Sequence, residues 1–408
     1  MKYLTRHECT YDFLVALAVC SLTYIPILLG LLFSIDILLP LTAPSAESID
    51  LVSSCYHFDA LHYLDIIRDG YSYDPTRPSL VAFFPAYPIL SWFLSQITGL
   101  SPEVGALLVA NLSLLGSFFF LARWLRLRWP DAIVEQRLFV LTIFGLWPLG
   151  FFFRMPYAES LFLCSTLAVL YGIERRWPSL VLALLTGFVT AVRPVGLALT
   201  AAFLWSVLTR RETTLRVKVV LVLLLTPLAS CGLLAYMGYQ WQAFGTPWGF
   251  ALTQQHWRFL SPKDHSLLTK LASLAMLEPI WGVYQPGYPR YWENSITVEP
   301  LLFNLYFWNP ILFILAGVLL VLGGWQRWLS GSECVLGAGL LGIPYLTRSY
   351  EMSMASHGRF AAVVVVNYLV IGRLLSGRPS WIMTLVYVVS ALFLCLITCL
   401  YAANYLVF

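Results

Sequence analysis

The stretch that decides the fold lies near the start of the chain, where residues 13–35 read FLVALAVCSLTYIPILLGLLFSI without a single charged side chain. An α-helix needs roughly 20 consecutive apolar residues to cross a bilayer, so this run is long enough to span one. Uncharged runs of similar length recur at residues 219–241, 303–325 and 381–408. Together they predict an all-α protein that crosses a membrane several times.

The composition of the 408 residues agrees with this prediction. Hydrophobic residues make up 59% of the chain and charged residues only 11%, whereas soluble domains carry about 25% charged residues. The net charge of +4 is explained by basic cytoplasmic loops, so no nucleic-acid partner is expected. The eight cysteines are scattered, mostly inside apolar runs, which is typical of neither a disulfide framework nor a metal site. We expect one integral membrane domain over residues 1–408.

Basic residues set the expected orientation, because Lys and Arg accumulate in short cytoplasmic loops. Placing the six basic clusters of the chain on the cytoplasmic side predicts a bundle of about eleven transmembrane helices. The first run is too long for a signal-peptide core and is interpreted as a retained helix. The predicted spans cover residues 13–35, 104–122, 138–153, 160–173, 177–192, 195–209, 219–241, 303–325, 334–347, 360–372 and 381–401.

This topology leaves two long loops on the non-cytoplasmic side, residues 36–103 and 242–302, both expected to carry short interfacial helices. Residues 84–100 are interpreted as interfacial or re-entrant, because a span there would turn the next basic cluster outward. Most acidic residues of the chain fall in these loops and in the outward turns. The functional surface is therefore expected on the non-cytoplasmic face.

The first long loop contains the most polar segment, YHFDALHYLDIIRDGY at residues 56–71. Its spacing predicts a short amphipathic helix on which Asp59, His62 and Ile66 share a face. A carboxylate held at a membrane boundary can have its pKa shifted towards the range of a general base. Asp65 is interpreted as an ordinary charge exposed to solvent. For Asp59, composition alone leaves open whether it is such a charge or a general base.

Four arginines lie in the outward turns, against the usual bias of basic residues towards the cytoplasm: Arg154, Arg193, Arg348 and Arg359. Guanidinium groups bind phosphate through two parallel hydrogen bonds and stay charged when partly desolvated. Charges at the membrane edge that resist the bias are functional hypotheses, and these four would suit a lipid phosphate. The structural alternative is that their side chains reach towards lipid headgroups.

Two aromatic segments accompany these charges. FFPAYP at residues 83–88 combines two prolines with three aromatic rings, which is typical of a rigid segment at the headgroup level. Residues 239–259, YQWQAFGTPWGFALTQQHWRF, join tryptophans to Gln254, Gln255 and His256. This set would form a sugar-binding wall, or simply an aromatic belt at the membrane interface.

The run FDALHYLDIIRDGY at residues 58–71 resembles the Trp-Asp-x-x-x-Tyr-x-x-Ile-Ala-x-x-Gly-Tyr signature of the PIG-V family. These are mannosyltransferases of the GT-C superfamily, typified by the second mannosyltransferase of glycosylphosphatidylinositol assembly. FFPAYPIL is similar to the family's Phe-Phe-Pro-x-Tyr-Pro, PYAESLFL to its Tyr-Ser-Glu-Ser-Leu-Phe and AVRPVGLAL to its Thr-Arg-x-x-Gly. FGTPWGFALTQQHW and MASHGRF also resemble family segments. The chain departs mildly at Phe58, Ala158 and Phe360, where Trp, Ser and Tyr are usual.

The resemblance implies a GT-C-type inverting transferase that takes mannose from a polyprenyl- or dolichyl-phosphate carrier to a lipid-linked or glycan acceptor. By matching position, Asp59 becomes the catalytic base, and Arg193 and Arg359, with Arg154, the donor phosphate-binding residues. The residues expected to bind the acceptor or sugar, or to orient these groups, are His57, His62, Asp65, Phe84, Tyr87, Glu159, Gln255, His256 and Trp257. No cofactor is expected, because the lipid-phosphate sugar is itself the donor. No metal is expected either, because the sequence shows no metal-site spacing.

Two rival hypotheses stay open at this stage. A related GT-C transferase could use another lipid-phosphate sugar, and a lipid or sugar transporter or flippase would also use outward arginines and prolines within the membrane. The sequence contains no obvious inverted repeat of broken helices, which counts against the transporter. The compact chain favours a bacterial inner membrane, with the endoplasmic reticulum as the location in a eukaryote.

Overall fold

The computed structural model describes residues 6–42, 50–210, 214–258, 266–294, 301 and 303–405. All regular secondary structure in these ranges is helical, as the sequence predicts. Parts of the two long predicted loops, residues 43–49, 259–265, 295–300 and 302, lie outside the described residues.

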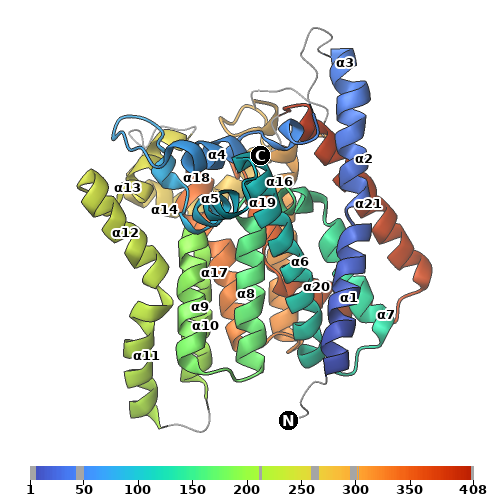
Figure 1. Ribbon diagram of the computed structural model, residues 1–408, viewed down its shortest axis with the longest axis vertical. Coiled ribbons are helices and arrows are strands. Elements are labelled where there is room, and N and C mark those ends of the chain that lie inside the picture. The colour runs from blue at the N-terminus through green and yellow to red at the C-terminus, as the bar shows by residue number, and fades with distance from the viewer. Residues whose placement is uncertain are drawn as a thin grey trace.

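Most of the longer helices, together with a few shorter ones, form one bundle, and most of them run along the vertical axis of Figure 1. They are α1 (Arg6–Leu22), α2 (Ile25–Phe33), α6 (Pro102–Arg128), α7 (Val134–Leu146), α8 (Glu159–Glu174), α9 (Ser179–Val192), α10 (Leu197–Leu208), α11 (Leu215–Ala229), α12 (Cys231–Phe244), α16 (Leu305–Trp325), α17 (Gly331–Pro344), α20 (Val366–Leu375) and α21 (Ser380–Ala402).

Shorter helices gather at one end of the bundle, the upper end in Figure 1. They are α3 (Leu39–Thr42), α4 (Asp59–Asp69), α5 (Ala86–Thr98), α13 (Gly249–Leu252), α14 (Leu267–Ala275), α15 (Glu278–Trp281), α18 (Tyr350–Met352) and α19 (His357–Ala362). Helices α4 and α5 lie across the ends of the long helices in both views. For α5 this arrangement agrees with the interfacial interpretation of residues 84–100.

Several helices have the length and apolarity of a membrane span. Four continuous helical stretches qualify, His7–Thr42, Pro102–Arg128, Leu305–Trp325 and Ser380–Ala402, and the bent pair α11 and α12 makes a fifth. Outward-facing leucines on these helices fit a lipid-facing surface. Helix is present in all eleven predicted span ranges, but most of these helices are too short to qualify alone. The count of about eleven therefore stays a prediction.

The bend between α11 and α12 has a local cause. The two axes differ by 49° across Ser230, and Pro227 lies in the last turn of α11. Proline lacks the amide hydrogen and clashes with the preceding turn, which kinks a helix. Close contact with α9 then holds the bend, because a Cβ at Gly187 would lie 2.3 Å from the Leu228 carbonyl oxygen.

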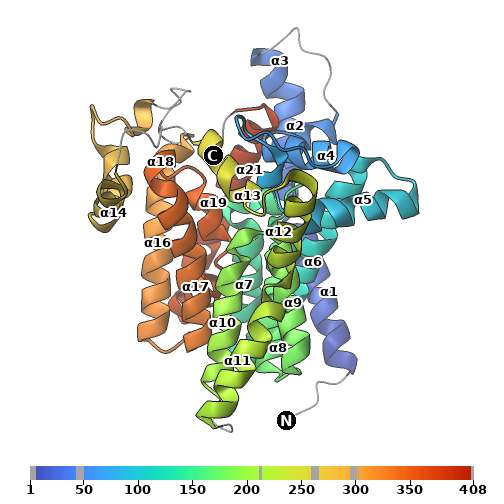
Figure 2. The same cartoon turned by 90° about the vertical axis from the view of Figure 1, so that its left-hand side faces the viewer.

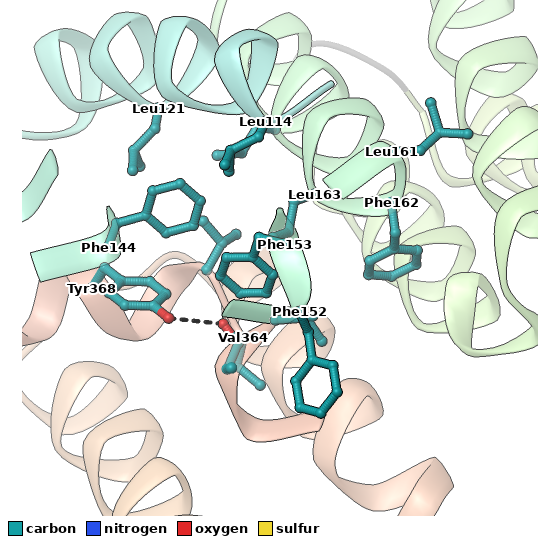
Figure 3. Close-up of a cluster of buried hydrophobic side chains, with 14 of the residues drawn as sticks. Leu114, Leu121, Phe144, Phe152, Phe153, Leu161, Phe162, Leu163, Val364 and Tyr368 are labelled. Carbon is teal, nitrogen blue, oxygen red and sulfur yellow. Dashed lines mark hydrogen bonds between the residues drawn. The ribbon is translucent and has the colours of Figure 1, made fainter. Parts of the chain in front are cut away.

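One continuous core of buried side chains joins the helices beneath the upper end. Figure 3 shows part of it, where Phe144 of α7 stacks on Phe153 and meets Tyr368 of α20 edge-on. Phe153 ends the 3₁₀ turn η4 (Pro148–Phe153), and its neighbour Phe152 projects away from it in the same view. Phe152 lies beneath an arginine of the candidate site, so this turn connects the core to the site.

Candidate active site

A cavity of about 430 Å³ opens at the end of the bundle that carries the short helices. It is lined by segments that are far apart in the sequence: the start of α4, the turns that follow α9 and α17, η6 (Thr253–Trp257) and α19. Four charged side chains line it, Asp59, Arg193, Arg348 and Arg359. The size falls within the roughly 300–1,000 Å³ of small-molecule sites.

The two carboxylates of this region begin helices. Asp59 is the first residue of α4, and Glu159 is the first residue of α8. A helix N-terminus carries a partial positive charge from its unpaired amide groups, which stabilises a carboxylate there. Glu159 has no exposed surface, so its charge depends on this helix end and on the arginines described next.

The arginines occupy the opposite ends of helices. Arg193 is the residue that follows α9, and Arg359 lies in the last turn of α19. Arg348 lies in the π-helical turn η10 (Tyr345–Ser349), which continues the C-terminal end of α17. A helix C-terminus favours a cation, so helix direction and side-chain charge agree around the cavity.

Ion pairs join these groups into one network. Arg359 donates from Nη1 to Asp59 Oδ2 at 2.7 Å and from Nε to Glu159 Oε1 at 2.5 Å. Arg193 donates from Nη1 to the same oxygen of Glu159 at 2.5 Å. Glu159 therefore lies behind the cavity and joins two arginines, while Arg359 fixes the carboxylate of Asp59. Charge-assisted hydrogen bonds of this kind are stronger than neutral ones and hold a defined geometry.

The Asp59 carboxylate remains accessible. Its side chain is 31% exposed, and its Oδ1 has no hydrogen-bond partner among the described residues. His62 lies one helical turn further along α4 and lines the same cavity, as the predicted amphipathic face requires. One oxygen of Asp59 is thus held by Arg359 and the other is free to accept a proton.

The backbone before Asp59 is strained. Phe58 adopts φ 54° and ψ −123°, a region that residues other than glycine rarely occupy. Hydroxyl groups of Tyr157 and Tyr401 both donate to the His57 carbonyl oxygen, at 3.0 and 3.2 Å, and hold this turn in place. Strain that the surrounding structure enforces is a feature of functional sites.

A second strained turn carries Arg359 to the cavity. Ser353, Met354 and Ser356 all have positive φ angles, of 50°, 60° and 64°. The buried His357 follows, and burial lowers the pKa of its imidazole to about 4. Its Nδ1 lies 3.1 Å from the Ala355 carbonyl oxygen, which fixes the ring inside this turn.

Aromatic side chains form another wall of the cavity. The His62 ring centroid lies 5.1 Å from those of both Phe83 and Trp257, and Phe83 and Trp257 are 6.0 Å apart. Gln254 lines the cavity beside them. Flat apolar rings next to an amide match the surfaces that bind sugar rings, with one face apolar and the edges able to form hydrogen bonds.

The structure brings part of the predicted set together. The predicted residues that line the cavity are Asp59, His62, Phe84, Arg193, Trp257 and Arg359. The predicted residues that do not line it are His57, Asp65, Tyr87, Arg154, Glu159, Gln255 and His256. Of this second group, only Glu159 pairs with the lining arginines.

Arg154 is held inside the bundle, apart from the other predicted phosphate-binding residues. Its side chain has no exposed surface. It donates from Nη1 to the Gly145 carbonyl oxygen at 3.2 Å and from Nη2 to Thr23 Oγ1 at 2.8 Å, and its guanidinium lies over the Tyr24 ring. These contacts fix α7 and η4 against the break between α1 and α2.

The other predicted residues outside the cavity lining either make structural contacts or are exposed. The buried Tyr87 hydroxyl donates to the Ala106 carbonyl oxygen at 2.9 Å and joins α5 to α6. Asp65 and Gln255 are exposed, and His256 Nε2 lies 2.9 Å from the Pro75 carbonyl oxygen. Burial lowers the pKa of the His57 imidazole, whose ring packs against Tyr401 at 5.3 Å.

The lining residues that were not among the predicted site residues include Gln254, Arg348 and Phe360. Gln254 differs from the predicted Gln255 by one position in a 3₁₀ turn, where adjacent residues point in different directions. Arg348 carries the same sequence signal as the other outward arginines. Phe360 follows Arg359 directly in MASHGRF and appears in the sequence only as a departure from a family pattern.

No group of three or more His, Cys, Asp or Glu side chains in the described part of the chain is arranged to hold a metal ion. The prediction that the protein needs neither a metal nor a cofactor stays a prediction.

Comparisons with known proteins give a limited likeness. No protein-family model matches the chain, and no curated protein matches it. Solved structures of the Archaeoglobus fulgidus oligosaccharyltransferase are similar in shape, one tethered to an acceptor peptide through a disulfide bond and one in the apo form. The TM-score is 0.46 in both cases, with 13% and 11% sequence identity over 96% of this chain. This chain spans about half of their length, 55% and 56% respectively.

Proposed function

We propose that this protein is a membrane glycosyltransferase of GT-C type that transfers a sugar from a lipid-phosphate carrier with inversion at the anomeric carbon. The observation that carries the proposal is that an accessible carboxylate and three arginines line one cavity at the end of an apolar bundle. A base and a cationic phosphate site are the two groups that such a transfer requires.

The charges around the cavity favour an anionic donor. Among the described residues, the carboxylates that pair with Arg193 and Arg359 are Asp59 and Glu159. With Arg348, these five groups carry one net positive charge when all are ionised. A phosphate held there would be neutralised as its bond to the sugar breaks. The same arrangement gives no advantage to a neutral ligand.

The reaction follows from this arrangement. The acceptor hydroxyl oxygen attacks the anomeric carbon, and Asp59 Oδ1 takes the hydroxyl proton. The bond between the anomeric carbon and the phosphate oxygen breaks, and the electron pair leaves with the carrier phosphate. The arginines stabilise the charge that develops there. By analogy with inverting glycosidases, attack occurs opposite the leaving group, so a β-linked carrier sugar gives an α-linked product.

The finer parts of the proposal rest on the resemblance to the PIG-V family. They are a mannosyl donor on a polyprenyl or dolichyl phosphate, a lipid-linked or glycan acceptor, and an active site on the non-cytoplasmic face of a bacterial inner membrane or the endoplasmic reticulum. The aromatic wall of His62, Phe83 and Trp257 would contact the sugar or acceptor.

The test uses purified protein in phosphatidylcholine nanodiscs with polyprenyl-phosphate [³H]mannose and host lipid extract as acceptor. We expect labelled product with wild-type protein and a turnover lower by about 10³-fold with Asp59→Asn. The matched control Asp65→Asn, on the same helix, should stay within about threefold of wild type. Turnover with a glucosyl carrier alone would keep the transferase and replace the sugar. Wild-type turnover by Asp59→Asn would remove Asp59 as the base. Movement of intact donor across the bilayer without product would favour a flippase.

A further inference from the structure

The three arginines of the cavity are not equivalent. Arg359 is only 6% exposed, and its Nε and Nη1 are both occupied by carboxylates. Its guanidinium also lies over the rings of Phe152 and Tyr157, at 4.7 and 4.6 Å. A group this constrained holds its partners in place and has little remaining capacity to bind a ligand.

Arg348 has the opposite surroundings. It lines the cavity and pairs with no carboxylate among the residues that the structure describes. Its guanidinium lies 5.5 Å from the Phe360 ring centroid, and that of Arg193 lies 5.6 Å from the same ring. Two guanidinium groups therefore lie near the same ring of the cavity wall. Of these two arginines, Arg193 has a carboxylate partner, Glu159, and Arg348 has none among the described residues.

The electrostatics agree with this geometry. Burial lowers the pKa of the Arg348 guanidinium to about 10, Asp59 opposes this shift, and the neighbouring Arg359 and Arg193 add to it. A cation that burial and like charges both disfavour gains most from a bound anion. The π-helical turn that presents Arg348 is a rare local geometry that occurs often at functional sites.

We propose that Arg348 is the principal residue that binds the phosphate of an isoprenoid phosphate, with Arg193 beside it across Phe360. Arg359 is a positioning residue that orients Asp59 through Nη1. The inference deepens the proposed function and rests on it for the isoprenoid nature of the anion. It assigns the phosphate to one of the four outward arginines that the family resemblance did not select, and it removes Arg154 from that role.

The experiment measures binding without any sugar, so that it can succeed or fail independently of transferase activity. Farnesyl phosphate is titrated into protein in phosphatidylcholine nanodiscs, and binding is followed by isothermal calorimetry. Farnesol is the uncharged probe, and inorganic phosphate is the probe without a chain. The variants are Arg348→Gln, Arg348→Lys, Asp59→Asn and the control Arg77→Gln, an exposed arginine outside the cavity lining.

We expect Arg348→Gln to weaken farnesyl phosphate binding by roughly tenfold or more, because hydrogen bonds to charged groups are the strong ones. Arg348→Lys keeps the charge and is expected to lose less. Asp59→Asn removes a negative charge from the cavity and should bind the probe at least as tightly as wild type. Arg77→Gln and farnesol binding should be unchanged. The opposite responses of the Arg348 and Asp59 variants distinguish a charge effect from damage to the fold.

Three results would overturn the inference. The first is wild-type affinity for farnesyl phosphate in Arg348→Gln. The second is an equal loss of farnesol binding in that variant, which would show a structural role. The third is inorganic phosphate binding as tightly as farnesyl phosphate, which would exclude an isoprenoid-specific site. If Arg348 is required for farnesyl phosphate binding but no sugar is transferred from any donor, the inference stands and the proposed function fails.

Discussion

Arginines gather at both ends of this helical bundle, and the two groups differ in what surrounds them. At the lower end in Figure 1, Asp12 of α1 pairs with Arg126 at 2.6 Å and with Arg123 at 3.4 Å. There Arg128, at the end of α6, pairs with Glu333 at 2.7 Å and with Glu174 at 3.5 Å. Each of these arginines has a carboxylate partner that belongs to a neighbouring helix.

At the upper end the arginines surround a cavity. Glu159 and Asp59 occupy Arg193 and Arg359, but Arg348 has no carboxylate among the described residues and faces a cavity. Strained backbone at Phe58 and at residues 353–356 occurs beside it. Paired buried charges fix how helices pack, whereas a spare charge beside a cavity can bind a ligand. Arg348 therefore differs from Arg123, Arg126 and Arg128 in two ways: it lines a cavity, and no described carboxylate pairs with it.

The largest expected effect is at the upper end. Asp59→Asn keeps the shape of the side chain but removes the proton acceptor, and general base catalysis contributes about 10²–10⁴-fold. We expect turnover of the lipid-phosphate sugar to fall by about 10³-fold, measured as initial rate with saturating donor. Asp65→Asn, on the same helix but exposed and outside the cavity, should keep turnover within about threefold. Equal losses in the two variants would contradict the assignment.

A matched change at the lower end should act on stability instead. Glu333 is buried, and its carboxylate accepts two hydrogen bonds from Arg128, at 2.7 and 2.8 Å. Breaking a buried pair costs about 3–5 kcal/mol, and partial exposure of Arg128 places Glu333→Gln near 3 kcal/mol. We expect a lower free energy of unfolding in a denaturant titration and unchanged turnover per folded molecule. The exposed Glu135→Gln is the control. Lost turnover at full stability would show that the lower end also contributes to catalysis.

Acid should lower the free energy of unfolding through His357, which lies at the upper end. Because burial lowers the pKa of this imidazole from 6.5 to about 4, the unfolded chain takes up a proton at a higher pH than the folded protein does. The free energy of unfolding should therefore fall as the pH decreases from about 6.5 to 4, by roughly 3 kcal/mol in total, and this contribution should level off below that window. His357→Gln should flatten this slope in unfolding titrations at several pH values. An identical slope in the variant would remove His357 as its cause.

The smallest effect is expected for Arg154, which belongs to the bundle interior although its sequence position resembles that of the cavity arginines. Arg154→Met should leave the affinity for farnesyl phosphate within about twofold, because the hydrogen bonds that its side chain makes to described residues go to Thr23 and to backbone carbonyl groups. The same calorimetric titration measures it, with Arg193→Gln as the contrasting variant. A tenfold loss of affinity in Arg154→Met would return Arg154 to the phosphate site.

The contrast between Arg154 and Arg348 also marks how far the sequence could predict the site. Periodicity and charge place Asp59 and His62 on one helix face, and both line the cavity. Both arginines lie in turns that the sequence predicts to face outward, however, and the path of η4 directs Arg154 into the bundle. That path depends on packing between segments distant in sequence, which no local pattern contains.

The fold also has parts that the sequence could predict and parts that it could not. Apolar runs predict helices, and helix is found in every predicted range. Span number is harder to predict, because helices such as α17 and α20 are short and surrounded by neighbours, so their apolar residues serve the protein core as well as lipid. The sequence also could not show which of Gln254 and Gln255 faces the cavity. In a 3₁₀ turn, a difference of one position decides this, and Gln254 is the residue that lines the cavity.

One measurement tests most directly whether the upper cavity is where the lipid phosphate binds. A farnesyl phosphate carrying a photoactivatable diazirine is bound to the protein in nanodiscs, irradiated, and the labelled peptides are identified by mass spectrometry. We expect labels within residues 192–195, 340–348 and 352–363, the segments that contribute lining residues to the cavity. Excess unlabelled farnesyl phosphate or the Arg348→Gln change should remove these labels. Labels confined to peptides around Arg123, Arg128 and Glu333, or labels that excess probe does not displace, would contradict the account.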